Sequence, residues 1–195
     1  MSRKILLTIL LGMMGLPASA LPLTFGISPG STDIGFAVDI LGVATAAGAF
    51  RQFSGSLTLD LDHPEQCAVT VSIDSGSAAM GWQPAASLLA GESYLDVEHY
   101  PEIRFISHQV TITGKDRVRM EGLLTLRGIS HWETFDAQLV DRRREAEDSA
   151  DSAEFAAIGS VRRSDYQMDD GQSLLDDRVT FTIRTRLSLV SAPAP

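Results

Sequence analysis

Alternation of apolar and polar residues is the feature that most constrains this chain. Residues 57–61 and 69–73 carry Leu, Val or Ile at every second position, with Thr, Ser or Asp between them. The same pattern recurs over residues 34–40, 118–126 and 179–189. Because successive strand side chains point to opposite faces of a sheet, each stretch predicts a β-strand with one buried face.

Weaker alternation covers residues 44–53, 103–112, 132–140 and 155–163. Together the stretches predict about eight or nine short strands, which is typical of an all-β sandwich or closed barrel. Two segments break the rhythm. Residues 82–91 suit a short helix, residues 164–177 are acidic and polar, and we expect both to lie across one end of the barrel.

The strand at residues 103–112 changes phase midway. Ile103 and Phe105 share one parity, whereas Val110 and Ile112 share the other. A β-bulge inserts one residue and restores the facing of the strand. We therefore predict a bulge near residues 107–109, and hairpin turns at Gly114 and Gly128.

The first twenty residues predict a cleavable signal peptide. Arg3 and Lys4 precede an apolar run at residues 5–16, and small residues follow at Ala18 and Ala20. The run is shorter than the roughly 20 residues that span a bilayer. We expect residues 21–195 to form one exported, periplasmic domain without an integral membrane segment.

Charge and cysteine content limit the partners. The chain has 25 acidic and 16 basic residues, a formal net charge of −9, so we expect no binding to nucleic acid or to anionic membrane surfaces. Its single cysteine, Cys67, excludes an intramolecular disulfide. We expect Cys67 to be a small buried apolar residue beside Val69, with a reactive thiol as the alternative.

Catalytic and metal-binding patterns are not evident. The histidines, His63, His99, His108 and His131, show no spacing typical of a metal site, and we expect surface roles for His63 and His131. No nucleophile motif or phosphate-binding glycine loop is present. We expect no catalytic residue, metal or cofactor, and therefore a protein that is not an enzyme.

The predicted barrel interior mixes large and small side chains. A barrel of about eight strands either fills with side chains or holds one slender ligand, and the sequence leaves both open. The predicted pore-lining residues are Phe36, Val38, Phe53, Phe105, Met120, Gly122, Leu124, Phe135, Ala157 and Phe181. Further small inward candidates are Ala137, Gly159 and either Ala37 or Ala47.

Four segments together resemble the YceI-like family. They are residues 50–60 (FRQFSGSLTLD), 93–105 (SYLDVEHYPEIRF), 122–129 (GLLTLRGI) and 163–168 (RSDYQM), and their order and spacing match across about residues 23–189. The resemblance implies a lipocalin-like, closed, eight-stranded antiparallel barrel whose apolar pore binds a long isoprenoid or related lipid. It also implies a possible homodimer.

The chain departs from the family pattern before residue 93. Ala85-Ala86 stands where the family usually carries an Arg-Asp pair, and Leu88-Leu89 stands where it carries His-Leu. The missing charge implies a less polar lipid, or an end sealed by the two leucines. Arg163 is the candidate for contact with a lipid head group, and a salt bridge with Asp165 is the alternative.

Three functions remain open at this stage. The first is a periplasmic lipid or isoprenoid carrier. The second is an interaction or envelope-stress protein with a filled core that acts only through its surface. The third is an enzyme that acts on a lipid bound in the pore.

Overall fold

A single curled antiparallel sheet makes up most of the structure. The structure, a computed structural model, describes residues 23–60, 63–143, 151–171 and 173–189. The strands are β1 (Leu23–Ile27), β2 (Thr32–Ile40), β3 (Ala44–Phe50), β4 (Phe53–Leu59), β5 (Ala68–Asp74), β6 (Ala78–Met80), β7 (Glu102–Gly114), β8 (Arg117–Leu126), β9 (Ile129–Arg143), β10 (Asp151–Arg162) and β11 (Leu175–Leu189).

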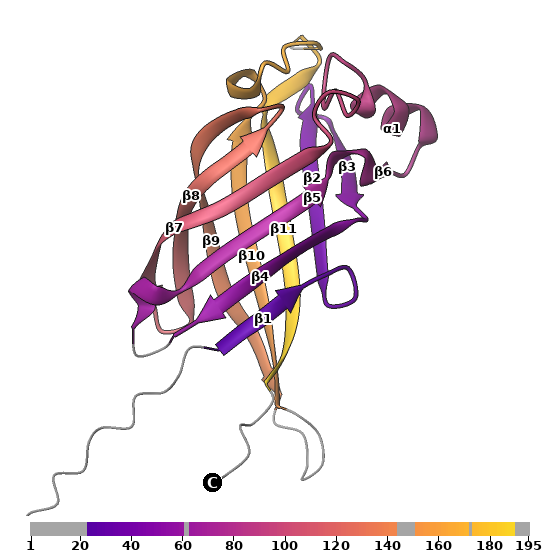
Figure 1. Ribbon diagram of the computed structural model, residues 1–195. Helices are drawn as coiled ribbons and strands as arrows, with labels where there is room; N and C mark the ends of the chain where they lie inside the picture. Colours follow the sequence, from indigo (N-terminus) through magenta and orange to yellow (C-terminus); the bar gives the residue numbers. More distant parts are fainter. Residues whose placement is uncertain (1–22, 61–62, 144–150, 172, 190–195) are drawn as a thin grey trace, which may run out of the picture.

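Helical elements are few and short in the described residues. They are η1 (Pro64–Gln66), η2 (Ser75–Ser77), α1 (Gln83–Ala90) and η3 (Ser164–Tyr166). Figure 1 shows α1 and η3 at the same end of the sheet, which we call the helical end. The β7–β8 turn lies at the opposite end. The predicted helix and the predicted irregular segment are thereby both confirmed.

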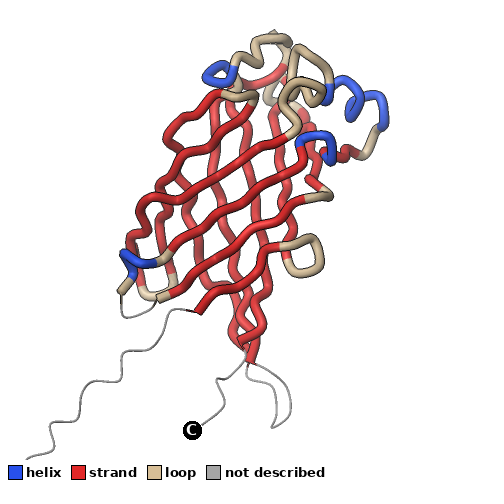
Figure 2. Tube along the Cα trace, viewed as in Figure 1, coloured by secondary structure: helices blue, strands red, loops and turns tan. Residues whose placement is uncertain are grey.

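The sheet wraps around one axis to form a barrel, as Figure 2 shows. Its strand order is β1-β4-β5-β7-β8-β9-β10-β11-β2-β3-β6, and neighbouring strands in this order are antiparallel. The all-β, lipocalin-like barrel class is confirmed, with eleven strands in place of the expected eight. The sequence reading missed β1 and β6, which form the two ends of this order.

Strands β1 and β6 stand at the two ends of the strand order and are not hydrogen-bonded to each other. Apolar side chains pack together across this seam. Ile27 of β1, Ile34 of β2 and Phe50 of β3 belong to the same buried apolar cluster. Burial of apolar surface from both sides of the seam therefore joins it. The cluster also includes Ile103, only 1% exposed, and Phe105, which face inward as the sequence predicted.

The predicted bulge and hairpin turns are present. The β7–β8 register shifts between Ser107 and Gln109, at the predicted phase change. Arg127 and Gly128, with φ of 51° and 70°, form the two-residue β8–β9 turn, and the second position is taken by glycine, which adopts a positive φ without strain. Cys67 is half-buried rather than buried, and its thiol donates a hydrogen bond to the Asp60 carbonyl oxygen.

Two glycines allow neighbouring strands to fold closely over one another. A Cβ on Gly122 of β8 would lie 2.7 Å from the Ser107 Cα of β7 and would also meet the Ile106 carbonyl oxygen. A Cβ on Gly55 of β4 would lie 3.1 Å from the Val71 Cα of β5. Only glycine fits at such approaches, which permit the strong curvature of the sheet.

Substitution of Gly122 by alanine should destabilise the fold. The added methyl group collides with backbone that cannot move aside, so we expect a loss of about 1–3 kcal/mol in the free energy of unfolding. Gly26→Ala is the matched control, because no heavy atom lies within 4 Å of its Cβ position. Urea denaturation measures both. Equal stability of the two variants would contradict the close approach.

Candidate functional site

The inner face of the barrel carries a continuous row of residues that we call the central row. Strand register places its members side by side across six strands. They are Met120, Phe135, Gly159, Phe181, Phe36 and Gly48. Gly159 and Gly48 interrupt the large side chains of the row, so each phenylalanine has a glycine as one of its neighbours.

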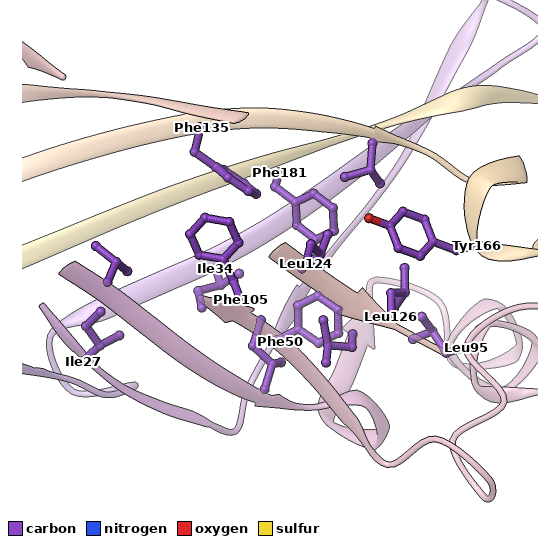
Figure 3. Close-up of a cluster of buried hydrophobic side chains, with 14 of the residues drawn as sticks. Ile27, Ile34, Phe50, Leu95, Phe105, Leu124, Leu126, Phe135, Tyr166 and Phe181 are labelled. Carbon is purple, nitrogen blue, oxygen red and sulfur yellow. The ribbon is translucent and has the colours of Figure 1, made fainter. Parts of the chain in front are cut away.

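Aromatic rings meet near the middle of the interior (Figure 3). The centroids of the Phe105 and Phe135 rings are 5.0 Å apart, and those of Phe135 and Phe181 are 6.4 Å apart, both in edge-on arrangements. A Cβ on Gly159 would lie 2.5 Å from Phe135 Cδ1. Gly159 therefore makes room for the Phe135 ring, and edge-on contacts of this kind stabilise the packing.

All ten predicted pore-lining residues lie on the inner face according to the ladders and the buried cluster. Their contact with a ligand stays a prediction. The buried residues are Phe105, Leu124, Phe135, Phe181 and Gly122, and the partly exposed residues are Phe36, Val38, Phe53, Met120 and Ala157.

Three small residues differ from their predicted roles. Gly122 offers no open space to a ligand, because the β7 backbone occupies the side on which its Cβ would stand. Ala37 and Ala47 pair with each other on β2 and β3, at the parity opposite to Phe36 and Phe50. Both alanines therefore lie on the outer face, since side chains alternate between faces along a strand.

The next inner row, toward the opposite end, contains smaller side chains. Val118, Ala137 and Ala157 pair across β8, β9 and β10, and all are partly exposed. Ile183 of β11 continues this row beside Ala157. On β8 and β9 this row is therefore less bulky than the central row, whereas the same register continues to the buried Ile34 and Phe50 on β2 and β3.

The helical end is closed by the segment that contains η3. Tyr166, with 0% of its surface exposed, and Met168 pack with Leu126 in the buried cluster. Figure 3 shows the Tyr166 ring with its hydroxyl pointing into the cluster. Arg127 fastens the closure, since its Nη1 donates a hydrogen bond to the Gln167 carbonyl oxygen at 2.6 Å.

Arg163 organises this closing segment. It is only 3% exposed, and its guanidinium donates to the carbonyl oxygens of Met168, Asp170, Leu175 and Asp176 at 2.8–3.4 Å. The structure therefore gives Arg163 backbone partners in place of the alternative salt bridge with Asp165. A head-group contact stays a prediction, and it would require the guanidinium to give up part of this set.

The sequence departure at α1 has a limited effect on the closure. Leu89 packs against the buried cluster, whereas Leu88 is 61% exposed. Of the two leucines expected to seal the end, only Leu89 contributes to it. Ala85 and Ala86 are half-buried on α1.

A polar cluster beneath the closure was missed by the sequence reading. The Tyr166 hydroxyl donates a hydrogen bond to Glu133 Oε1 at 2.9 Å. His131 Nε2 donates to the Asp165 carbonyl oxygen at 2.9 Å, and its ring lies edge-on to Tyr166. His131 is thus half-buried and faces inward, and the expectation of a surface role was wrong.

Burial controls the protonation of this cluster. Desolvation raises the pKa of Glu133, with Asp165 adding to the rise, while the Tyr166 hydrogen bond and His131 oppose it. Burial and the nearby Glu133 carboxylate raise the pKa of Tyr166, so its hydroxyl remains a donor. The sequence held one signal for this cluster. His131 and Glu133 alternate with Phe135 along the strand, which indicates that all three point to the same face of the sheet.

Other kinds of site receive no support. No group of three or more potential metal ligands occurs among the described residues. Within the same residues, no helix has the length and apolarity needed to span a membrane. A groove of about 380 Å³ that is open to solvent touches Phe53 and Ile73, and Asp74 and Glu102 also line it.

Comparison with known proteins gives a consistent result. The YceI-like domain matches residues 25–187. A UPF0312 protein from Photorhabdus laumondii is 31% identical over 169 residues, which cover 85% of this chain and 87% of that protein.

Solved structures share the fold at lower sequence identity. BcnA from Burkholderia cenocepacia superposes with a TM-score of 0.73 and 19% identity, covering 83% of this chain and 99% of BcnA. A polyisoprenoid binding domain from Saccharophagus degradans, implicated in plant cell wall breakdown, gives a TM-score of 0.59 and 13% identity. That match covers 86% of this chain and 98% of the domain.

Replacing Arg163 by glutamine should weaken the closure strongly. The variant removes the donor from the buried Met168 carbonyl oxygen and from three part-buried carbonyl oxygens, and we expect a loss of about 2–4 kcal/mol in the free energy of unfolding. Arg162→Gln is the matched control, since Arg162 is exposed on the neighbouring position. Chemical denaturation compares them. A loss within about 0.5 kcal/mol for both would contradict a structural role for Arg163.

Glu133→Gln should change how stability depends on pH. The raised pKa of Glu133 means that the folded protein holds this proton to higher pH than the unfolded chain. The free energy of unfolding of the wild type, compared with that of Glu133→Gln, should therefore fall as the pH rises. The fall begins near the ordinary pKa of 4.5 and continues through the higher pKa of the folded state. Melting temperatures from pH 4 to 8 test this. A constant difference would show that Glu133 is not desolvated.

Proposed function

Because the chain belongs to the YceI-like family, we propose that it is a binding protein that holds a long isoprenoid or related lipid chain inside its barrel. The proposal includes export to the periplasm, based on the signal-peptide pattern of residues 1–20, which lie outside the described residues. The function is non-catalytic and consists of shielding the chain from water.

The continuous apolar inner face carries this proposal. The central row and the next row present Phe, Met, Val, Ile, Ala and Gly across β8, β9, β10 and β11. Transfer of each CH₂ group from water to such a surface is favourable by about 0.8 kcal/mol. A long hydrocarbon chain could therefore bind tightly with few polar contacts.

Side-chain size favours one half of the interior for the chain. Ala137 and Ala157 are small and partly exposed, whereas the Phe105, Phe135 and Phe181 rings occupy the middle. We place part of the lipid beside Ala137 and Ala157. The Saccharophagus domain supports the ligand class, because it is a polyisoprenoid binding domain.

A second candidate is an envelope protein that acts only through its surface. The contact between the Phe105, Phe135 and Phe181 rings favours it, because rings that fill the interior leave less room for a ligand. The two candidates differ in one respect. Only the first requires that a lipid enter the barrel.

Blocking the interior at Ala157 should abolish lipid uptake. Ala157→Trp places an indole beside Ala137 and Ile183 on the inner face. Ala156→Trp is the matched control, because Ala156 lies on the same strand but faces outward beside Gln138 and Arg184. Uptake of a long-chain isoprenoid alcohol by delipidated protein, measured by native mass spectrometry, should be lost only in Ala157→Trp.

Circular dichroism and melting temperature establish that both variants fold. Uptake by folded Ala157→Trp equal to that of Ala156→Trp would contradict the proposed position of the lipid. Wild-type protein that binds no isoprenoid or acyl lipid would favour the surface-acting candidate.

A further inference from the structure

The polar cluster of Glu133, His131 and Tyr166 lies where two strands part. The ladder between β9 and β10 ends at the Phe135–Gly159 pair, although β9 begins at Ile129 and β10 continues to Arg162. His131 and Glu133 stand on the part of β9 that pairs with β8 but not with β10. The η3 segment is attached there through Asp165 and Tyr166.

Glu133 is a carboxylate within the apolar interior. It shares the inner face of β9 with Phe135, a member of the central row, two residues away. From Ile129 to Leu139, all of which are described, it is the one acidic residue on this face. A lipid chain that lies beside Ala137 and extends along the inner face of β9 past Phe135 would therefore bring one end close to Glu133.

The hydrogen bonds of Glu133 leave capacity for a ligand. Its Oε1 accepts the Tyr166 hydroxyl hydrogen, and no hydrogen bond to Oε2 occurs within the described part of the chain. Glu133 is also half-buried, so part of its surface remains accessible. In contrast, the inward-facing hydroxyl groups of Thr32 and Thr185 form a hydrogen bond with each other at 2.7 Å, so each already has a partner within the protein.

Within the described part of the chain, two other groups act electrostatically on the Glu133 carboxyl group: Asp165 raises its pKa and His131 lowers it. The Arg163 and Arg127 guanidinium groups are held by carbonyl oxygens of the closing segment. Because Asp165 and His131 oppose each other, an anionic head group at Glu133 would meet the like charge of the carboxylate in a poorly hydrated setting, which is unfavourable.

We propose that Glu133 selects the polar end of the bound lipid: it accepts a hydrogen bond from a neutral head group such as an alcohol, and it disfavours a phosphate. This inference rests on the proposed function. It assigns a ligand class to the interior, namely long-chain isoprenoid alcohols in preference to their phosphates. Tyr166 fixes the position of the carboxylate through its hydrogen bond.

A competition experiment tests the selection. Delipidated protein is mixed with equimolar geranylgeraniol and geranylgeranyl phosphate, and native mass spectrometry reports the ratio of the two complexes. Wild type should favour the alcohol at least tenfold. Glu133→Gln removes the charge while it retains an acceptor for Tyr166, so the preference should fall by about tenfold, equivalent to 1.4 kcal/mol.

Glu121→Gln is the matched control. Glu121 is exposed on the outer face of β8, adjacent to Gly122, so its loss changes the net charge by the same amount. This variant should keep the wild-type preference. A role for Glu133 that is only structural would alter melting temperature in Glu133→Gln without changing the ratio of complexes.

The outcomes separate this inference from the function on which it rests. Equal binding of both ligands by wild type, or an unchanged ratio in Glu133→Gln, would overturn the selection while lipid binding stands. Retention of neither ligand, together with failure to bind other long-chain lipids, would instead overturn the proposed function.

Discussion

Close approach of backbones at glycine is the constraint on which the barrel depends. At Gly122 the β7 backbone folds directly over β8, and at Gly55 the β5 backbone approaches β4 in the same way. A side chain at either position would hold the strands apart. Because these approaches curve the sheet, inward residues from distant strands can meet and form one apolar interior.

Glycine also determines how the interior is filled. The Phe135 ring lies against Gly159, and the Phe36 ring lies against Gly48. These two pairs let large rings fit within the central row, while the next row carries the small side chains of Ala137 and Ala157 on β9 and β10. The interior therefore combines a packed aromatic middle with a neighbouring region of smaller side chains, beside which we propose that part of the lipid lies.

The alternation of apolar and polar residues predicted the fold well, because the face to which a strand side chain points depends on its position along the strand. The phase change between Phe105 and Val110 predicted the bulge, and alternation placed Phe36, Phe135 and Phe181 on the inner face. The split of β3 from β4 and the short β6 depend on corners between strands. Corners between strands do not change the alternation of apolar and polar residues enough to be recognised in the sequence.

The polar features could not be predicted in the same way, since their partners are distant in sequence. Tyr166 reaches Glu133 across 33 positions, and His131 reaches Asp165 across 34. Arg163 is likewise satisfied by carbonyls of an irregular segment, and no side-chain pattern identifies those partners. Glu133 shares the parity of Phe135 along β9, a signal that the sequence analysis did not use, and only the fold shows what Glu133 contacts.

Occupancy of the interior is the central claim, and the contents of the natively produced protein test it most directly. The measurement is organic extraction and mass spectrometry of protein purified from the cells that naturally produce it. The account predicts one long-chain lipid in stoichiometric amount. Protein that is consistently empty, and that also refuses added lipid after purification, would contradict it.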